Sequence, residues 1–312
     1  MNDSVKGTKP DVTLAGTSYG KSGVRILRVA KDGNVHYIKE LEVSTKLTLD
    51  TEKDYISGDN SDIIATDSQK NIVYILAKKF GIKSPEDFSI LLCNHFLSKY
   101  NHVMKVVIEI EEILWNRISY GEASSQMYHN HAFVHTPIYI RNTTVTWNRH
   151  EYFPTVISGI KNLRVLKTAQ SSFVNFVDDE YRTLPDQKDR IFSTIIDCDW
   201  EYMKIPDIDY DKSWEVVKHC ILKNFAGDLV CGTPSPSVQH TLYTAEKEAL
   251  ERVPAINTIE MTMPNKHYFA FDFSKFKGLE IESTNDGDTV FLPLDKPSGV
   301  IYGKLNRKPS KL

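Results

Sequence analysis

The sequence predicts an α+β fold with two tandem modules, each an antiparallel sheet with helices packed on one face. The chain has 312 residues, more than one small hydrophobic core usually fills, so two domains are expected. In the first half, the spacing of apolar residues predicts two strands, two helices and two more strands. The second half repeats strand pairs and two helices with longer strands, and this repetition predicts the second module.

The first module is expected over residues 18–141, after a polar N-terminal arm of residues 1–17 that we expect to be disordered. Lys31-Asp-Gly-Asn34 separates two runs rich in β-branched and apolar residues, which is typical of a hairpin. The elements expected in this module are strands at 24–29 and up to Leu49, helices from near Ser68 to Gly81 and from Pro85 onward, and paired strands at 103–115 and 132–140.

The stretch Thr66-Asp67-Ser68-Gln69 predicts a helix start and a candidate site. Thr66 and Gln69 have the spacing of a capping box, in which two side chains satisfy backbone N–H groups of the first turn. A helix N-terminus also presents free N–H groups and positive dipole charge, so this corner can dock an anion or a polar heterocycle. From the local sequence alone, capping remains the simpler interpretation of Thr66.

The second module is expected over residues 142–303, followed by a C-terminal tail at residues 304–312. Ser235 followed by Pro236 is typical of a helix cap with proline at the first position, which puts Gln239 in the opening turn. Both modules therefore place a polar side chain where a helix begins beside a strand end. The elements expected here are strands at 143–149, 156–168, 191–203 and 256–263, and helices at 210–224 and 238–252.

Composition argues against several classes of protein. The net charge is -3 and charged residues make up 25% of the chain, which does not favour a nucleic-acid partner. No run approaches the ~18 apolar residues of a membrane helix, so no membrane partner is expected, and the N-terminus lacks the apolar stretch of a signal peptide. The four cysteines show no CxxC spacing, and we expect buried free thiols rather than a disulfide framework.

The chain ends in Ser310-Lys311-Leu312. A C-terminal Ser-Lys-Leu is the address that the peroxisomal import receptor binds. We therefore expect this receptor as a partner and the peroxisome matrix as the location.

A series of short motifs runs in order along nearly the whole chain: Tyr19-Gly-Lys21, Ala65-Thr66-Asp67-Ser68, Gln170-Ser-Ser-Phe173, Asp179-Glu-Tyr181, Asp189-Arg190, Ser235-Pro-Ser-Val238-Gln239 and Asn265-Lys-His267-Tyr268. In this order they resemble the urate oxidase (uricase) family, whose members have the tunnelling fold. The resemblance implies oxidation of urate by O2 and water to 5-hydroxyisourate and hydrogen peroxide, with no metal or organic cofactor. The peroxisomal tail agrees with it independently.

The resemblance also implies roles for individual residues. Lys21, Thr66 and His267 resemble the family's proton relay, in which a lysine acts as base and a threonine hydroxyl conveys the proton. Arg190 offers a planar fork of donors to an anionic purine, and a flat purine can stack on the face of Phe173. The substrate-binding residues implied are Thr66, Asp67, Phe173, Arg190, Val238, Gln239 and Asn265.

The resemblance further implies an assembly. Open antiparallel sheets leave unpaired edge strands, and closing a ring of such sheets removes those edges. The family closes its sheets into a barrel on oligomerisation and stacks two rings into a homotetramer, with each active site at a subunit interface. We expect the Lys21 and Thr66 side of one subunit to face the Arg190 and His267 side of its neighbour.

Two other functions stay open on the sequence alone. His129, His131 and His135 share one face if their stretch is a strand, and histidine is the commonest metal ligand, so a zinc-dependent tunnelling-fold enzyme acting on a pterin or purine is conceivable. A non-catalytic purine-binding homologue would keep Arg190 and Phe173 without the relay. The loop at 118–128 also looks longer than the family pattern.

Overall fold

The protein is described by a computed structural model that covers residues 12–121, 125–276, 289–294 and 296–308. The strands are β1 (Tyr19–Asp32), β2 (Val35–Leu49), β3 (Val103–Ile113), β4 (Trp115–Tyr120), β5 (Met127–His135), β6 (Ile140–Asn148), β7 (Thr155–Lys167), β8 (Phe192–Tyr202), β9 (Ile256–Ala270), β10 (Phe291–Leu294) and β11 (Val300–Asn306). The helices are α1 (Lys53–Ile56), α2 (Thr66–Phe80), α3 (Pro85–Lys99), α4 (Tyr210–Ala226) and α5 (Val238–Arg252).

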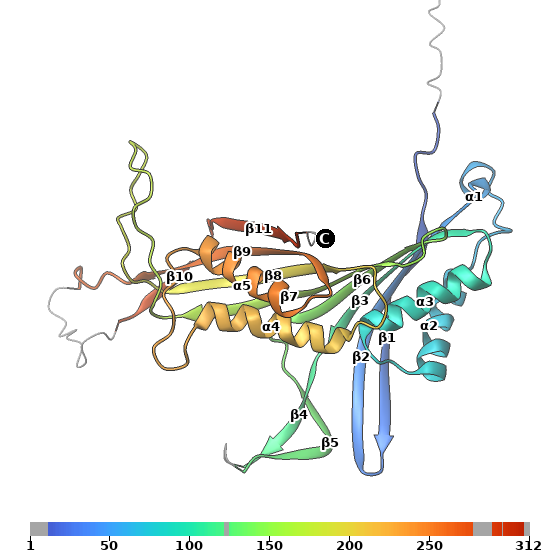
Figure 1. Cartoon of the computed structure of the whole chain (residues 1–312), viewed down its shortest axis with the longest axis horizontal. Coiled ribbons are helices and arrows are strands. Elements are labelled where there is room, and N and C mark those ends of the chain that lie inside the picture. The colour runs from blue at the N-terminus through green and yellow to red at the C-terminus, as the bar shows by residue number, and fades with distance from the viewer. Residues whose placement is uncertain (1–11, 122–124, 277–288, 295, 309–312) are drawn as a thin grey trace, which may run out of the picture.

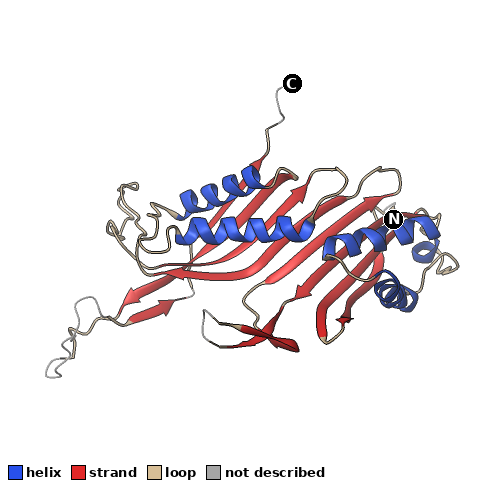
Figure 2. Ribbon diagram, turned by 60° about the horizontal axis from the view of Figure 1, so that its bottom comes forward, coloured by secondary structure: helices blue, strands red, loops and turns tan. Residues whose placement is uncertain are grey.

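One nine-stranded sheet forms the body of the molecule, and every pairing in it is antiparallel. The strands follow the order β1-β2-β3-β6-β7-β8-β9-β10, and β11 also pairs with β9. Helices α2 to α5 lie on one face of the sheet (Figure 2), with α2 and α3 near one end and α4 and α5 over the other (Figure 1). The predicted α+β class with helices on one face is confirmed, and the sheet is open in the single chain.

The hydrophobic core fills the space between the helices and the sheet. Strand β2 alternates, so that Leu41, Val43 and Leu47 are fully buried on the helix side. Helix α2 places Val73 and Leu76 against this face, as its three- and four-residue apolar spacing predicts. Under α4 and α5 the equivalent layer is Trp200, Trp214, Val217, Ile259 and Met261.

The β1–β2 hairpin has the predicted turn. Gly33 adopts a φ of 55°, and Asp32 pairs directly with Val35. This left-handed conformation is one that glycine tolerates and other residues adopt at a cost. A register shift between Lys21 and Val24, with Gly23 at a φ of 67°, interrupts β1 near its start.

The two halves of the chain share one sheet, because β3 pairs with β6. The predicted boundary at residues 141/142 falls inside β6, so no linker separates the modules at that point. Arg141 of β6 donates to Glu86 of α3 at 2.8 Å and to Asp211 of α4 at 2.7 Å. Arg141 is 5% exposed and Glu86 is 0% exposed, so helices from both halves bind one buried guanidinium.

The predicted pairing of strands at 103–115 and 132–140 is wrong. β5 ends at His135 and pairs with β4 as a separate two-stranded hairpin, while the partner of β3 is β6. The physical reason is the break at Thr136 and Pro137, because proline has no N–H to donate to a central ladder.

The C-terminal end of the chain differs from the prediction, whereas the N-terminal arm is only partly described. Residues 12–17 have no regular secondary structure, and the rest of the predicted arm lies outside the described residues. The predicted tail from residue 304 overlaps β11, whose Lys304–Asn306 segment pairs with β9. The targeting tripeptide Ser310-Lys311-Leu312 lies outside the described residues. Within the described part of the chain, no helix is long and apolar enough to cross a membrane.

Candidate active site

The first candidate cluster is the corner where α2 begins. Helix α2 begins at Thr66 rather than near Ser68, its N-cap residue is Ala65, and no side chain caps it. The predicted capping box is wrong because Gln69 points into the core, where it is 0% exposed. There its amide accepts from the Thr45 hydroxyl at 2.7 Å and donates to the Ile64 carbonyl at 3.0 Å. A buried side-chain amide is costly without hydrogen-bond partners, whereas water can replace a side-chain cap at an exposed helix end. Gln69 therefore pairs with Thr45 and Ile64 instead of capping the helix.

Thr45 also connects this corner to β1. Its hydroxyl oxygen accepts from the backbone N–H of Lys21 at 3.2 Å, so Lys21 and the first turn of α2 share one anchor. The Asp67 carboxylate accepts from Lys70 at 2.6 Å and from Asn71 at 3.0 Å. The hydrogen bond with Lys70 lowers the pKa of Asp67 most, and the charge of Lys21 lowers it further. Lys21, Thr66 and Asp67 therefore belong to one corner.

The second candidate cluster lines a cavity of about 510 Å³ at the other end of the sheet. Arg190, just before β8, and Asn265 and His267, both on β9, line this cavity together. Asn265 is held in register opposite Thr194 of β8.

The walls of the cavity are apolar and aromatic, and they include Leu184, Pro185, Tyr268 and Phe291. This mixture of apolar walls and a few polar groups is typical of a small-molecule site.

Arg190 is one of the charged residues that line this cavity. Its backbone N–H donates to the Ser171 carbonyl at 2.8 Å, and its guanidinium carbon lies 5.2 Å from the centroid of the Phe173 ring. Burial lowers the pKa of Arg190, but an arginine remains charged at neutral pH. Among the described residues its Nε atom is buried without a hydrogen-bond partner. A buried donor without a partner is costly, so this atom suits a ligand that brings an acceptor.

Helix α5 begins beside the Phe173 loop. The predicted cap is wrong by two residues: the Ser237 hydroxyl accepts from the His240 N–H, and the helix begins at Val238. Ser235 instead links the loops, because its carbonyl accepts from Ser172 N–H at 2.9 Å. Val238 is buried and Gln239 is exposed in the opening turn. Neither of them, nor Phe173, lines the 510 Å³ cavity itself.

The two clusters are far apart in one chain. Lys21 lies on β1 and His267 on β9, with β2, β3, β6, β7 and β8 between them (Figure 1). At about 4.8 Å per neighbouring strand, six steps separate them by roughly 29 Å. A single chain therefore presents two incomplete groups of the predicted site residues rather than one complete set.

The predicted histidine face is only partly assembled. The His129 and His131 rings lie 4.6 Å apart, and His36 lies 5.4 Å from His131. His135 instead contacts Trp115, at 5.2 Å between ring centroids. Within the described residues, no group of three or more His, Cys, Asp or Glu side chains is placed to hold a metal ion.

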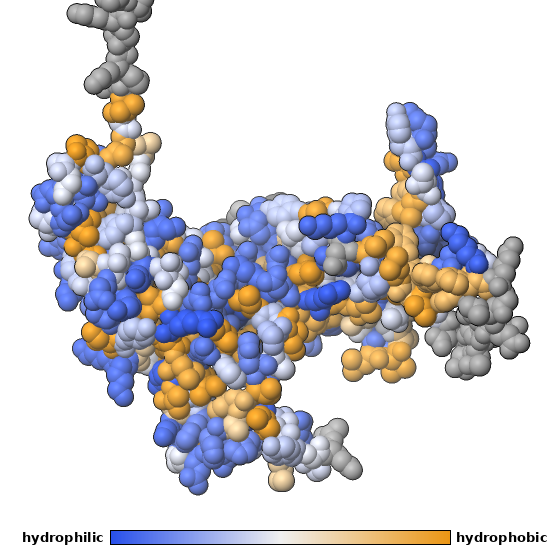
Figure 3. All heavy atoms as spheres, turned by 180° about the vertical axis from the view of Figure 1, so that it is seen from behind, coloured by the Kyte–Doolittle hydropathy of each residue, from blue (hydrophilic) through white to orange (hydrophobic). Residues whose placement is uncertain are grey.

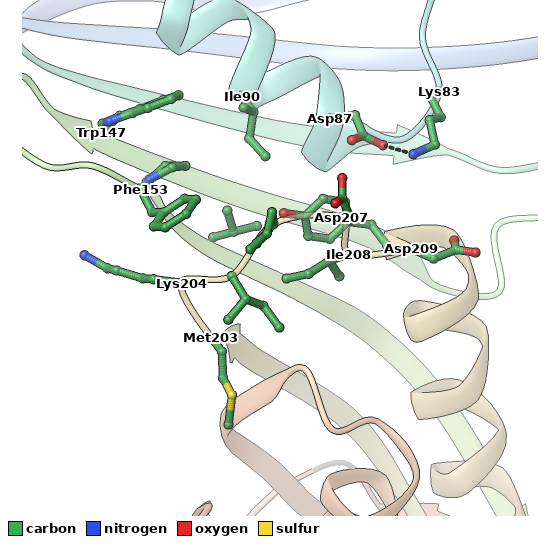
Figure 4. Close-up of a pocket in the computed structure, with 15 residues that line it drawn as sticks. Lys83, Asp87, Ile90, Trp147, Phe153, Met203, Lys204, Asp207, Ile208 and Asp209 are labelled. Carbon is green, nitrogen blue, oxygen red and sulfur yellow. Dashed lines mark ion pairs between the residues drawn. The ribbon is translucent and has the colours of Figure 1, made fainter.

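A second hollow, of about 440 Å³, lies between α3 and the segment that leads into α4. Figure 4 shows Trp147 and Phe153 on one side of it and the Lys83–Asp87 ion pair on the other. None of the predicted site residues lines this hollow. It therefore gives no support to the predicted site.

Several residues that support the two clusters were not predicted from the sequence. Thr45 and Gln69 hold the first corner, and Lys167 donates to the Ser235 hydroxyl at 2.8 Å behind the second. Phe176 stacks on Phe173 with ring centroids 4.5 Å apart. Only the three-residue spacing of Phe173 and Phe176 could have indicated one of these contacts from the sequence.

Comparisons with known proteins agree on one family. The family profile named Uricase matches residues 17–146 and 156–302. Uricase of Drosophila pseudoobscura pseudoobscura is 47% identical, over 98% of this chain and 95% of its own length. Uricase of Oryctolagus cuniculus is 44% identical, over 96% of both chains.

Solved structures show the same relationship. The crystal structure of uricase from Arthrobacter globiformis superposes with a TM-score of 0.84 and 31% sequence identity, over 97% of this chain and 98% of that one. Sequence and fold thus agree over nearly the full length, and the chain belongs to the uricase family.

Proposed function

We propose that this protein is a urate oxidase that converts urate, O2 and water into 5-hydroxyisourate and hydrogen peroxide. The observation that carries the proposal is near-full-length similarity to proteins named uricase, in a chain whose cavity holds a half-buried arginine near an aromatic ring. Urate is a flat anion with several adjacent acceptors. A guanidinium fork and an aromatic face suit both its charge and its shape.

The Arg190 side of the site binds the substrate. Arg190 pairs two adjacent acceptors of the purine, and Phe173 stacks on its face. Gln239 presents its donor and acceptor to the other edge, and the backbone N–H of Val238 adds a donor at the start of α5. Asn265 holds O2 or the attacking water above the ring.

The Lys21 side moves protons. Urate must lose a second proton before two electrons pass to O2, which takes up two protons to become hydrogen peroxide, while water adds to the oxidised ring. Lys21 acts as base, Thr66 conveys the proton through its hydroxyl, and His267 completes the relay. O2 is a co-substrate, and the proposed reaction uses no metal or organic cofactor.

A complete site requires two subunits in this proposal. The roughly 29 Å between β1 and β9 supports the idea that Lys21, Thr66 and Asp67 of one subunit face Arg190, Asn265 and His267 of another. Exposed apolar side chains on the outer strands support association: Leu27 is 57% exposed on β1 and Val300 is 68% exposed on β11. Apolar patches are visible on the surface in Figure 3. The proposed assembly is a homotetramer with the active sites at its interfaces.

The location proposed is the peroxisome matrix, through the import receptor that binds Ser310-Lys311-Leu312. An enzyme that releases hydrogen peroxide fits a compartment that handles this product.

The function is tested with purified protein that has been treated with a chelator and dialysed. The protein should bleach the ultraviolet absorbance of urate while an oxygen electrode records the consumption of one O2 per urate. Loss of activity that returns when zinc is added would favour the zinc-dependent alternative. Binding of urate without turnover would favour the non-catalytic homologue.

The shared site is tested by complementation. Thr66→Ala and Arg190→Ala proteins, each inactive alone, are mixed after mild dissociation and then reassociated. Hybrid interfaces pair an intact Thr66 side with an intact Arg190 side, so part of the activity should return. Hybrids that form by native mass measurement but remain inactive would rule out the shared site.

A further inference from the structure

Phe173 and Phe176 stack on each other, and an arginine lies near each ring. The Phe173 and Phe176 rings are nearly parallel, with centroids 4.5 Å apart and planes 13° from each other. The guanidinium carbon of Arg182 lies 4.1 Å from the centroid of the Phe176 ring, and that of Arg190 lies 5.2 Å from the Phe173 ring. We call this set the arginine–phenylalanine stack.

The loop that carries the stack is folded to form it. Asn175 has a φ of 59°, a left-handed conformation that asparagine tolerates, and this turn brings Phe176 back over Phe173. Phe173 and Gln187 exchange backbone hydrogen bonds of 2.7 and 2.9 Å. These bonds join the two arms of the loop at the residue that carries the first ring. The backbone conformation of the loop therefore fixes the positions of the two rings.

Arg182 is itself held in place from several directions. Its Nε donates to the Leu184 carbonyl at 2.9 Å, and its guanidinium pairs with Asp186 at 2.8 Å and with Asp178 at 3.4 Å. Its side chain is only 21% exposed, in a loop where Tyr181 is 81% exposed. A cation over an aromatic face is attracted to the ring's negative quadrupole, so Arg182 holds Phe176 flat.

The stack determines which face of Phe173 is free. Phe176 covers one face, and a flat ligand can use only the other, within reach of the Arg190 guanidinium. A ring whose plane is already held loses little conformational entropy when it binds a ligand, and such preorganisation increases affinity. We propose that Phe176 and Arg182 are positioning residues that fix the plane of Phe173 for stacking of the purine. This inference rests on the proposed function.

The test compares Phe176→Leu, which keeps apolar bulk but removes the ring, with Phe176→Tyr, which keeps the ring. Two quantities are measured: steady-state kinetics with urate, and the Kd of xanthine as an unreactive purine probe. The leucine variant should raise KM and the xanthine Kd about 3- to 10-fold, the range of an aromatic pair. Its kcat should change less than twofold, because stacking binds the ground state and the transition state alike. The Phe176→Tyr variant should have the same KM for urate and the same Kd for xanthine as the unchanged protein.

Val177→Ala is the matched control, because Val177 is the next residue in the loop and is 78% exposed. Its constants should equal those of the unchanged protein. Arg182→Met is the second variant, and it leaves both rings in place, so it tests the stack even if the leucine variant fails to fold. It should raise the xanthine Kd about 2- to 4-fold, and Arg182→Lys should recover part of this loss.

The outcomes separate the two proposals. An unchanged protein that does not oxidise urate means that the proposed function is wrong. An active unchanged protein, with folded Phe176→Leu and Arg182→Met variants whose constants stay within twofold of its own, means that the stack does not position Phe173. A leucine variant whose kcat falls while KM stays constant would also overturn the inference.

Discussion

Gln69 of α2 and Thr45 of β2 share a buried hydrogen bond of 2.7 Å that joins the first turn of the helix to the sheet. The same hydroxyl accepts from Lys21 N–H, so three elements meet at one side chain. Thr66 lies one turn before Gln69 on the same helix. The position of the proposed relay threonine therefore depends on a glutamine that is fully buried in the core.

Replacing Gln69 with leucine should destabilise the protein. The change leaves the Thr45 hydroxyl and the Ile64 carbonyl without their buried partner, so the free energy of unfolding should fall by about 1–3 kcal/mol. Urea unfolding followed by circular dichroism measures the change. Ser68→Ala, at an exposed neighbouring position, should stay within about 0.5 kcal/mol. A Gln69→Leu protein as stable as this control would contradict the assignment.

Replacing Arg190 with lysine should weaken urate binding more than it slows the chemistry. Lysine keeps the charge but loses the planar fork, so KM should rise roughly 30-fold, equivalent to about 2 kcal/mol. Initial rates over a range of urate concentrations measure it. Arg252→Lys, near the end of α5, is the control and should not change KM. An unchanged KM in the Arg190 variant would remove this residue from the substrate site.

The stability of the protein should depend on the protonation of Glu246. This carboxyl is 0% exposed between α5 and β11, where a Cβ on Gly303 would lie 3.6 Å from its Oε2. Burial, with a smaller effect from Glu260, raises the pKa of Glu246 to about 8.

The sign of this pH effect follows from linkage. In the unfolded chain Glu246 loses its proton above about pH 4.5, whereas the folded protein keeps the proton up to about pH 8. Between these values the folded state binds more protons, so the contribution of Glu246 to stability falls as the pH rises. Glu246→Gln should raise the thermal midpoint at pH 8 and have a smaller effect at pH 5. Glu251→Gln, exposed on the same helix, should show no such difference between the two pH values.

Removal of Leu312 should prevent peroxisomal import without affecting catalysis. The shortened protein, with a fluorescent tag at its N-terminus, should spread through the cytosol, while the purified enzyme should keep its activity. Fluorescence that stays punctate after truncation would rule out the tripeptide as the signal.

The spacing of residues in the sequence correctly predicted those helices whose ends depend on contacts between residues close together in the chain. The predicted bounds of helix α5, residues 238–252, match the structure, because its apolar residues recur at helical spacing. The predicted start of α3 at Pro85 also matches the structure, and the Ser84 hydroxyl caps this helix by accepting from the Asp87 N–H. In both cases the relevant contacts lie within a few residues along the chain.

Non-local contacts could not be predicted in this way. Strand β3 pairs with β6 rather than with the nearer β5, and no pattern within either strand specifies its partner. Gln69 fits a capping box by spacing, but its burial against Thr45 depends on a strand more than twenty residues away. The site residues were identified through family resemblance, and their separation into two clusters depends on strand order, which local spacing does not encode.

The buried guanidinium of Arg141 has a consequence for how the protein unfolds. Glu86 comes from the first half of the chain and Asp211 from the second, so opening either half removes one partner of a buried charge, which is costly. Although the sequence repeats one plan twice, the halves should melt in a single cooperative transition. Each half expressed alone would also expose the hydrogen-bonding edge of β3 or β6 to other chains, which makes the separated repeats prone to aggregation.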